Sequence, residues 1–195
     1  MLEIGQWVIL QACEHLKRLH ESGIPKTFKK LSINVSAIQF TQENFVSNLL
    51  DIIKANSVPA DLLGIELTES TLIKNIDEVS DIILELRAQG VTTSIDDFGT
   101  GYSSLAYLSR FPIETLKIDQ AFVRGIHSDR GNRAIVDAIM ALGNSLHLNI
   151  IAEGVETDDE LSCLKELKCQ HYQGYYFNRP MPYDDFFTLI CGPQI

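Results

Sequence analysis

Apolar residues follow two spacings along the chain, and these spacings predict a regular succession of helices and strands. The first 19 or so residues have apolar side chains at helical spacing, which predicts one long amphipathic helix. Short runs rich in Ile, Leu, Val and Thr then recur, each typical of a strand in a buried parallel sheet. The predicted strands are Leu31–Asn34, Gly64–Leu67, Thr92–Asp96, Thr115–Ile118, Asn149–Ala152 and His171–Tyr176.

The stretches between these strands carry the helical spacing. Gly90 is expected to end one helix and Thr157 to begin another, because glycine adopts left-handed backbone and threonine caps helix N-termini. Strict alternation of strand and helix predicts an α/β fold with parallel strands. An open doubly wound sheet and a (β/α)8 barrel both fit, and a count of six strands in 195 residues favours the open sheet. The predicted helices are Glu43–Ala55, Asn75–Gln89, Ser103–Ser109, Asn132–Leu146, Asp158–Leu167 and Tyr183–Ile190.

Each predicted strand delivers a polar side chain at or near its C-terminal end. In a parallel barrel the C-terminal ends of the strands meet at one mouth. In an open sheet they would lie in a row, and distant strands could not share one ion. Convergent carboxylate and amide oxygens suit Mg²⁺ or Mn²⁺, and an adjacent pair of aspartates suits two ions. The set therefore favours the barrel. Its members are Asn34, Glu66, Asp96, Asp97, Lys117, Glu153 and Gln173.

Each member taken singly has an ordinary explanation. A lone glutamate at a strand end is more often a solvated loop residue or a helix cap than a ligand. Lys117 is more informative, because a lysine within an apolar strand is costly unless it is paired. The recurrence over six strands is what favours a functional site, whereas the five histidines share no ligand spacing.

Composition narrows the classes of function. A net charge of -10 argues against a broad DNA-binding surface, which needs basic residues. The chain has no apolar run of about 18 residues, so we expect no membrane span. The four cysteines form no CxxC pair, which argues against a zinc site or a disulfide framework and fits a cytoplasmic location.

Six segments together resemble the EAL domain family. The resemblance covers nearly the whole chain and implies a modified TIM (β/α)8 barrel with one antiparallel strand. It also implies hydrolysis of cyclic di-GMP to linear pGpG with two Mg²⁺ or Mn²⁺ ions. The segments are Asn34-Val-Ser-Ala, Glu66-Leu-Thr-Glu69-Ser, Asp96-Asp97-Phe-Gly-Thr-Gly-Tyr-Ser-Ser, Leu116-Lys117-Ile-Asp119, Ala152-Glu153-Gly-Val-Glu156-Thr and Gln173-Gly-Tyr-Tyr-Phe-Asn-Arg179-Pro.

The resemblance implies a role for each matched residue. Lys117 is similar to the residue that orients the attacking water, and Arg179 is near enough in sequence to reach the substrate. Glu69 resembles the anchor of the loop after Asp97, with Ser103 as its partner, and the family ties that loop to dimer signalling. The implied metal ligands are Asn34, Glu66, Asp96 and Asp97, and the remaining implied site residues are Glu153, as ligand or general base, Glu156 and Gln173.

The family's Glu-x-Leu motif has no counterpart in this chain. In the family it lies on a strand that precedes the opening helix and supplies a metal ligand. We therefore expect residues 1–195 to form a partial EAL domain, with about six of eight strands, without the N-terminal two strands and first helix. We also expect this chain by itself to form a homodimer or associate otherwise, and to have little activity.

Three functions remain open on the sequence. The first is a cyclic di-GMP phosphodiesterase in bacterial second-messenger signalling. The second is a non-catalytic EAL-like module that binds cyclic di-GMP or a partner protein. The third is another barrel enzyme with one divalent metal, such as an enolase-type site, and the order of the motifs argues against it.

Overall fold

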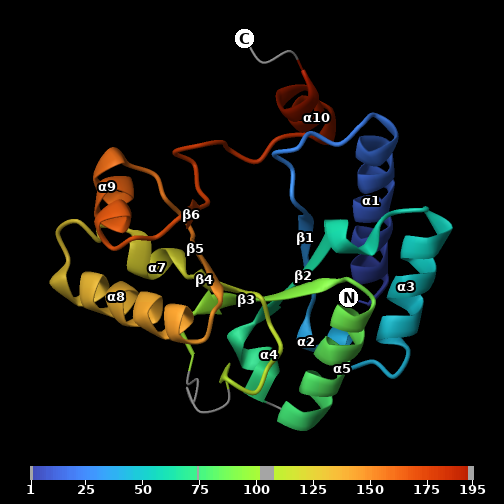
Figure 1. The fold of residues 1–195 in the computed structure, drawn as a ribbon, viewed down its shortest axis with the longest axis horizontal. Helices are drawn as coiled ribbons and strands as arrows, with labels where there is room; N and C mark the ends of the chain where they lie inside the picture. The colour runs from blue at the N-terminus through green and yellow to red at the C-terminus, as the bar shows by residue number, and fades with distance from the viewer. Residues whose placement is uncertain (1, 74, 102–107, 193–195) are drawn as a thin grey trace.

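The computed structural model describes residues 2–73, 75–101 and 108–192. Its centre is one sheet of six parallel strands, and each strand pairs with the next one along the chain. The sheet curves into a half-barrel with helices packed around its outer face (Figure 1). The α/β class and the barrel-type order predicted from the sequence are confirmed. The strands are β1 (Leu31–Asn34), β2 (Leu63–Thr68), β3 (Thr92–Phe98), β4 (Thr115–Ile118), β5 (Asn149–Ala152) and β6 (His171–Tyr172).

Helices alternate with these strands as the apolar spacing predicts. The longer ones are α1 (Leu2–Glu21), α3 (Phe45–Ala55), α5 (Ile76–Ala88), α8 (Arg130–Ser145), α9 (Asp158–Glu166) and α10 (Tyr183–Cys191). Short helices that the sequence pattern did not indicate are α2 (Ala37–Phe40), α4 (Glu69–Ile73), α7 (Gln120–Val123) and the 3-10 turn Ala60–Leu62. Where the structure describes the chain, it has no helix long and apolar enough to span a membrane.

The two faces of the sheet differ in chemistry. Side chains on the outer face, such as Ile65, Ile95 and Leu116, are fully buried against the helices and form the core. Side chains on the inner face, such as Ser94 and Thr115, are mostly polar and surround an open hollow of about 620 Å³. Burial of the outer face stabilises the fold, at roughly 25 cal/mol for each Å² of apolar surface removed from water. The inner face is left to carry polar chemistry.

The predicted helix boundaries at Gly90 and Thr157 are confirmed. Gly90 has a φ of +91°, in the left-handed region that glycine tolerates after a helix. Thr157 caps α9, and Glu160 returns a bond to the cap backbone, which completes a capping box. The predicted helix Ser103–Ser109 lies mostly outside the described residues.

Strand β6 is shorter than the prediction of His171–Tyr176. After Tyr172 the chain packs against the segment that follows β5, where the Tyr176 N–H donates to the carbonyl of Val155. Gly174 lies so close to this segment that a Cβ would sit 2.2 Å from the Val155 oxygen. Strand β6 therefore ends at Tyr172, because the backbone after it packs against Val155.

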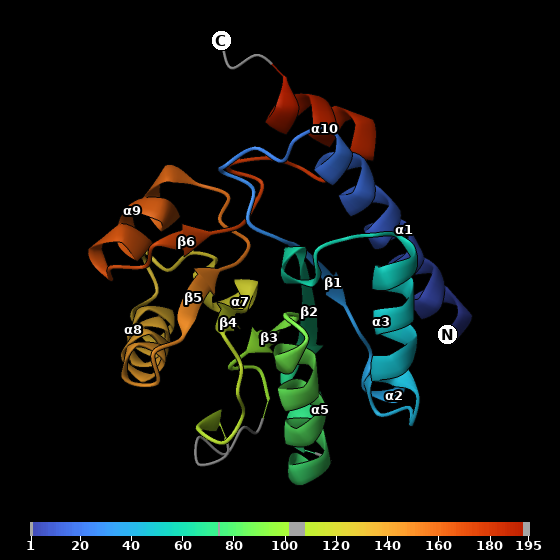
Figure 2. The ribbon, with the colours of Figure 1, turned by 45° about the vertical axis from the view of Figure 1, so that its right-hand side comes forward.

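Helix α10 lies beside the C-terminal half of α1 (Figure 2). The Tyr183 ring stacks on His15 with ring centroids 4.0 Å apart, and its hydroxyl donates to the His15 carbonyl at 2.9 Å. Arg18 lies over the same ring and pairs with Asp184 at 2.9 Å. These contacts join the first and last described helices across the open side of the sheet.

Candidate metal centre and its neighbouring hollow

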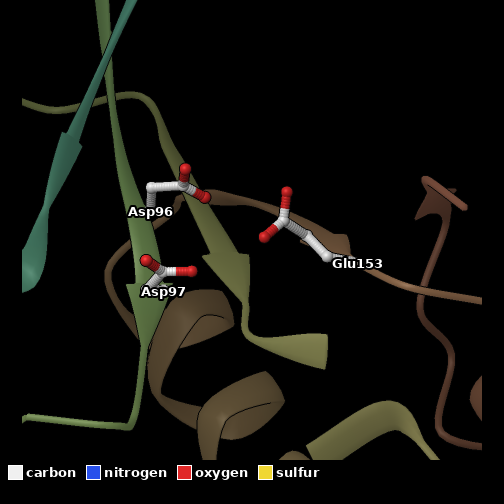
Figure 3. A group of neighbouring side chains, drawn as sticks. All are labelled: Asp96, Asp97 and Glu153. Atoms are coloured by element: carbon white, nitrogen blue, oxygen red, sulfur yellow. The ribbon is translucent and has the colours of Figure 1, made fainter. Parts of the chain in front are cut away.

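Near its C-terminal end, strand β3 carries two adjacent acidic residues, which a regular strand would point to opposite faces. The pairing of β3 with β4 shifts register between Ile95 and Phe98, and Asp97 has a φ of +54°. Aspartate tolerates this left-handed conformation better than most residues. The irregularity lets the Asp97 carboxylate join that of Asp96 at the mouth. Glu153, just after β5, faces both, and ligand oxygens of the three lie within 4.8 Å of one another (Figure 3).

Lys117 lies at the centre of these carboxylates. It comes from β4 and is only 3% exposed. Its Nζ atom lies 2.6 Å from Glu66 Oε2, 2.6 Å from Glu153 Oε1 and 3.0 Å from Asp96 Oδ1. Lys117 thus brings Glu66, from β2, into the cluster. Among the described residues, its one positive charge faces three carboxylates, with Asp97 beside them.

The pKa values of the cluster reflect this crowding. Burial acts to lower the pKa of Lys117, but hydrogen bonds to Glu153 and Glu66 raise it well above its usual value. Burial raises the pKa of Glu153 to about 7, against the lowering effect of Lys117 and with a further rise from Asp96. Burial, a hydrogen bond with Asp119 and the charge of Asp96 raise the pKa of Asp97. The cluster therefore holds more negative charge than Lys117 neutralises.

The residues present fit a divalent cation. Asp96 Oδ1 is buried, and no described group is directed at it for a hydrogen bond, although the Lys117 ammonium is 3.0 Å away. The ammonium supplies charge there without a directed bond, and an unbonded buried carboxylate oxygen is unfavourable. Asn34 pairs in register with Glu66 and adds an amide oxygen to the same hollow. Carboxylate and amide oxygens are ligands for hard cations.

A second hollow of about 260 Å³ adjoins the cluster at Asp97 and Glu153. Glu156 and Gln173 line it, and the Glu156 carboxylate accepts a hydrogen bond from Arg124 at 3.0 Å. Gln173 also lines the larger hollow, so it borders both spaces. The two hollows give the cluster room for an extended ligand.

Arg179 contacts Tyr175, one of the residues that line this hollow. Its guanidinium is 4.7 Å from the ring centroid of Tyr175, which lines the hollow, and the Arg179 side chain is exposed. The contact places Arg179 next to one residue of the wall of the hollow.

Glu69 is the first residue of α4, and its side chain is buried. Its Oε2 atom accepts hydrogen bonds from the N–H groups of Gly99 at 2.9 Å and Gly101 at 3.3 Å. Glu69 thus ties α4 to the segment that follows Asp97. Ser103, its expected partner, lies outside the described residues.

Two residues at the site had no role in the sequence-based prediction. Asp119 caps α7 through the Ala121 N–H at 2.6 Å and interacts with Asp97. Its position two residues after Lys117 was a signal, since residues two apart in a strand share a face. Arg124, which donates a hydrogen bond to Glu156, lies directly after α7 and had no such signal.

The sequence of this chain is similar to a known domain family and to several known proteins. Residues 1–180 match the EAL domain family. The chain is 39% identical over 92% of its length to the cyclic di-GMP phosphodiesterase NbdA of Pseudomonas aeruginosa, covering 23% of that protein. It is 39% identical over 98% of its length to the bifunctional diguanylate cyclase/cyclic di-GMP phosphodiesterase MucR of the same organism, covering 28% of it. The chain thus spans about a quarter of these relatives.

Solved structures give the same picture. The PaMucR phosphodiesterase in complex with c-di-GMP matches with a TM-score of 0.89 and 40% identity, over 94% of this chain and 74% of that one. A manganese and cyclic di-GMP complex of Klebsiella pneumoniae BlrP1 matches with a TM-score of 0.77 and 30% identity, over 90% of this chain and 45% of that one. A divalent cation is therefore present in a related structure, as the acidic cluster of this chain suggests.

Proposed function

The chain belongs to the EAL domain family, and we propose that its site serves the hydrolysis of cyclic di-GMP to linear pGpG, at the low rate that the sequence predicts for residues 1–195 by themselves. The observation that carries this proposal is the cluster of Glu66, Asp96 and Glu153 around the buried Lys117, with Asp97 beside them. Such a cluster suits the hydrolysis of a phosphodiester, whose negative charge needs cations nearby.

Asn34, Glu66, Asp96 and Asp97 are the residues that would hold two divalent cations, and we propose Mg²⁺ or Mn²⁺. When bound, these ions would neutralise charge on the attacking and leaving oxygens. Lys117 donates to Glu66 and Glu153 and is held so that it orients the attacking water. With a pKa of about 7, Glu153 is suited to accept a proton near neutral pH.

The remaining site residues surround the substrate in this proposal. Glu156 and Gln173 offer polar groups to the nucleotide from the walls of the second hollow, and Arg179 contributes from its place beside Tyr175. Glu69 anchors the segment after Asp97 and so holds the Asp97 carboxylate in place. We further propose a cytoplasmic location, where cyclic di-GMP acts as a second messenger, and self-association of this chain.

Replacing Asp96 with asparagine tests the proposed function. The change keeps the size of the side chain and removes one carboxylate charge from the cluster. We expect turnover of cyclic di-GMP with Mg²⁺ or Mn²⁺ to fall on the order of 100-fold or more. The measurement is chromatographic detection of pGpG, with Asp81→Asn, on the exposed face of α5, as the matched control.

Near-normal turnover by Asp96→Asn would contradict the assignment of the cluster. Binding of cyclic di-GMP by the unchanged chain, without any turnover, would instead favour the non-catalytic signalling module.

A further inference from the structure

Two loops that wall the second hollow are joined by one buried carboxylate. One loop follows β4 and includes α7 up to Gly125, and the other runs from Glu153 to Thr157 after β5. Glu160, in the first turn of α9, is only 5% exposed. Its Oε1 atom accepts the Gly125 N–H at 3.0 Å. Its Oε2 atom accepts the N–H groups of Glu156 at 2.9 Å and Thr157 at 3.0 Å.

Glu160 is held in its ionised form. Burial by itself would raise the pKa of this carboxyl, but the three backbone hydrogen bonds lower it below its usual value. Hydrogen bonds to an ionised acceptor are roughly twice as strong as bonds between neutral groups. The Glu160 carboxylate therefore fixes the backbone of both loops.

A capping box alone does not account for these contacts. A capping box needs only two reciprocal bonds between Glu160 and the cap residue Thr157: the Thr157 N–H donates to the Glu160 carboxylate, and the Glu160 N–H donates to the Thr157 hydroxyl. The bonds to Glu156 and to Gly125, which is 35 residues away, go beyond it. They connect the start of α9 to the end of α7.

The hydrogen bonds of Glu160 set the position of a pair of charged side chains at the second hollow. Arg124 directly precedes Gly125, and its guanidinium bonds the Glu156 carboxylate at 3.0 Å. Both side chains of this pair are well exposed, at 61% and 40%, and an exposed ion pair contributes little by itself. The buried Glu160 holds the backbone from which both side chains project.

We propose that Glu160 is a positioning residue for substrate binding: it fixes Arg124 and Glu156 along the wall of the second hollow. This inference rests on the proposed function, because the hollow adjoins Asp97 and Glu153 of the candidate metal centre. Glu160 acts through these two residues and does not itself face the hollow. Its loss should therefore weaken substrate binding more than it slows the chemical step.

The test compares Glu160→Gln with the control Asp159→Asn. Glutamine keeps the size of the side chain, but its NH₂ group cannot accept one of the backbone N–H groups that Glu160 now binds. Asp159→Asn removes the same charge from the same turn of α9 at an exposed position. In cyclic di-GMP hydrolysis we expect Glu160→Gln to raise KM on the order of tenfold, with kcat changed less than about threefold. The control should change neither.

A second variant, Arg124→Gln, removes the ion pair between Arg124 and Glu156 and leaves α9 unchanged. Arg124→Gln should raise KM in the same direction, and the double variant should raise it less than the product of the two single effects, because both act through Glu156. Full multiplicativity of the two effects would contradict a shared action.

Amide hydrogen exchange gives a readout that needs no substrate. Glu160→Gln should speed exchange at Gly125 and Glu156, whereas Asp159→Asn should leave it slow. Faster exchange with an unchanged KM, or a fall in kcat with KM unchanged, would overturn the positioning role. Absence of hydrolysis by the unchanged chain would contradict the proposed function instead, and the exchange data would still decide whether Glu160 joins the two loops.

Discussion

At the scale of single residues, the site depends on carboxylates held close together around one ammonium. Glu66, Asp96 and Glu153 each lie within 3.0 Å of Lys117 Nζ. Carboxylates placed this close raise one another's pKa unless cations neutralise them. Burial and Asp96 together leave the pKa of Glu153 at about 7 despite the nearby lysine. The proton on Glu153 and a metal cation therefore compete for the same negative charge.

Metal binding is expected to release a proton near neutral pH. Since the pKa of Glu153 is raised to about 7, this residue is largely protonated at about pH 6 and ionised at about pH 8. A bound cation favours the ionised form, so Mn²⁺ affinity should rise as pH increases through that range. Calorimetry at about pH 6 in buffers of different ionisation enthalpy should show close to one proton released for each binding event.

Glu153→Gln is the matched variant, because glutamine has no carboxyl proton to release when the metal binds. Its Mn²⁺ binding should be weaker and should depend less on pH in the same range. A parent chain whose Mn²⁺ affinity is the same at about pH 6 and about pH 8 would contradict the raised pKa as the cause.

At the scale of elements, the irregular end of β3 decides where the second aspartate points. Asp97 has a φ of +54°, in the left-handed region. Asparagine tolerates this conformation, whereas for alanine it costs roughly 1 kcal/mol. Asp97→Asn and Asp97→Ala remove the same charge, so their difference isolates the backbone conformation. We expect Asp97→Ala to be less stable than Asp97→Asn by about 1 kcal/mol in urea unfolding.

A helical position gives the control for that comparison. At Asp81, in α5, alanine should be more stable than asparagine, because alanine has the higher helix propensity. If the two Asp97 variants are equally stable, the left-handed conformation of Asp97 in this structure is contradicted.

The sequence predicts elements well where their signals are local. The limits of β1, β4 and β5 follow from short apolar runs, and the start of α9 follows from the capping threonine Thr157. Helices of four or five residues, such as α2, α4 and α7, are too short to show a helical period.

The remaining features depend on contacts between distant segments. The register shift of β3 depends on its pairing with β4, and the early end of β6 depends on packing against Val155. Polar strand ends predicted a shared site, and the structure brings Glu66, Asp96 and Glu153 to one lysine. The contacts of Arg124 and Glu160 join segments more than 30 residues apart, which no local pattern indicates.

At the scale of the whole molecule, the described sheet has two edges, at β1 and β6. Unpaired strand edges tend to pair with other chains. Helix α1 adds an exposed apolar surface, in which Ile4 is 67% and Trp7 60% exposed. Edges and apolar surface together favour association between copies of this chain.

We expect the purified chain to self-associate with increasing concentration. Light scattering should give a mass above the 21.9 kDa of one copy. Trp7→Gln should lower the apparent mass at a given concentration, because it removes part of the apolar surface. Ile135→Gln, at an exposed apolar residue of α8, is the matched control. A chain that stays at the mass of one copy over the accessible range would contradict the association.

The central claim is that Asp96 and Asp97 hold divalent cations beside a bound cyclic dinucleotide. The most direct measurement is a crystal structure of the chain with Mn²⁺ and cyclic di-GMP, with anomalous scattering used to locate manganese. The account predicts anomalous peaks within about 2.5 Å of carboxylate oxygens of Asp96 and Asp97, and a phosphate of the ligand next to them. Bound cyclic di-GMP with no manganese at these carboxylates, or manganese only elsewhere on the chain, would contradict it.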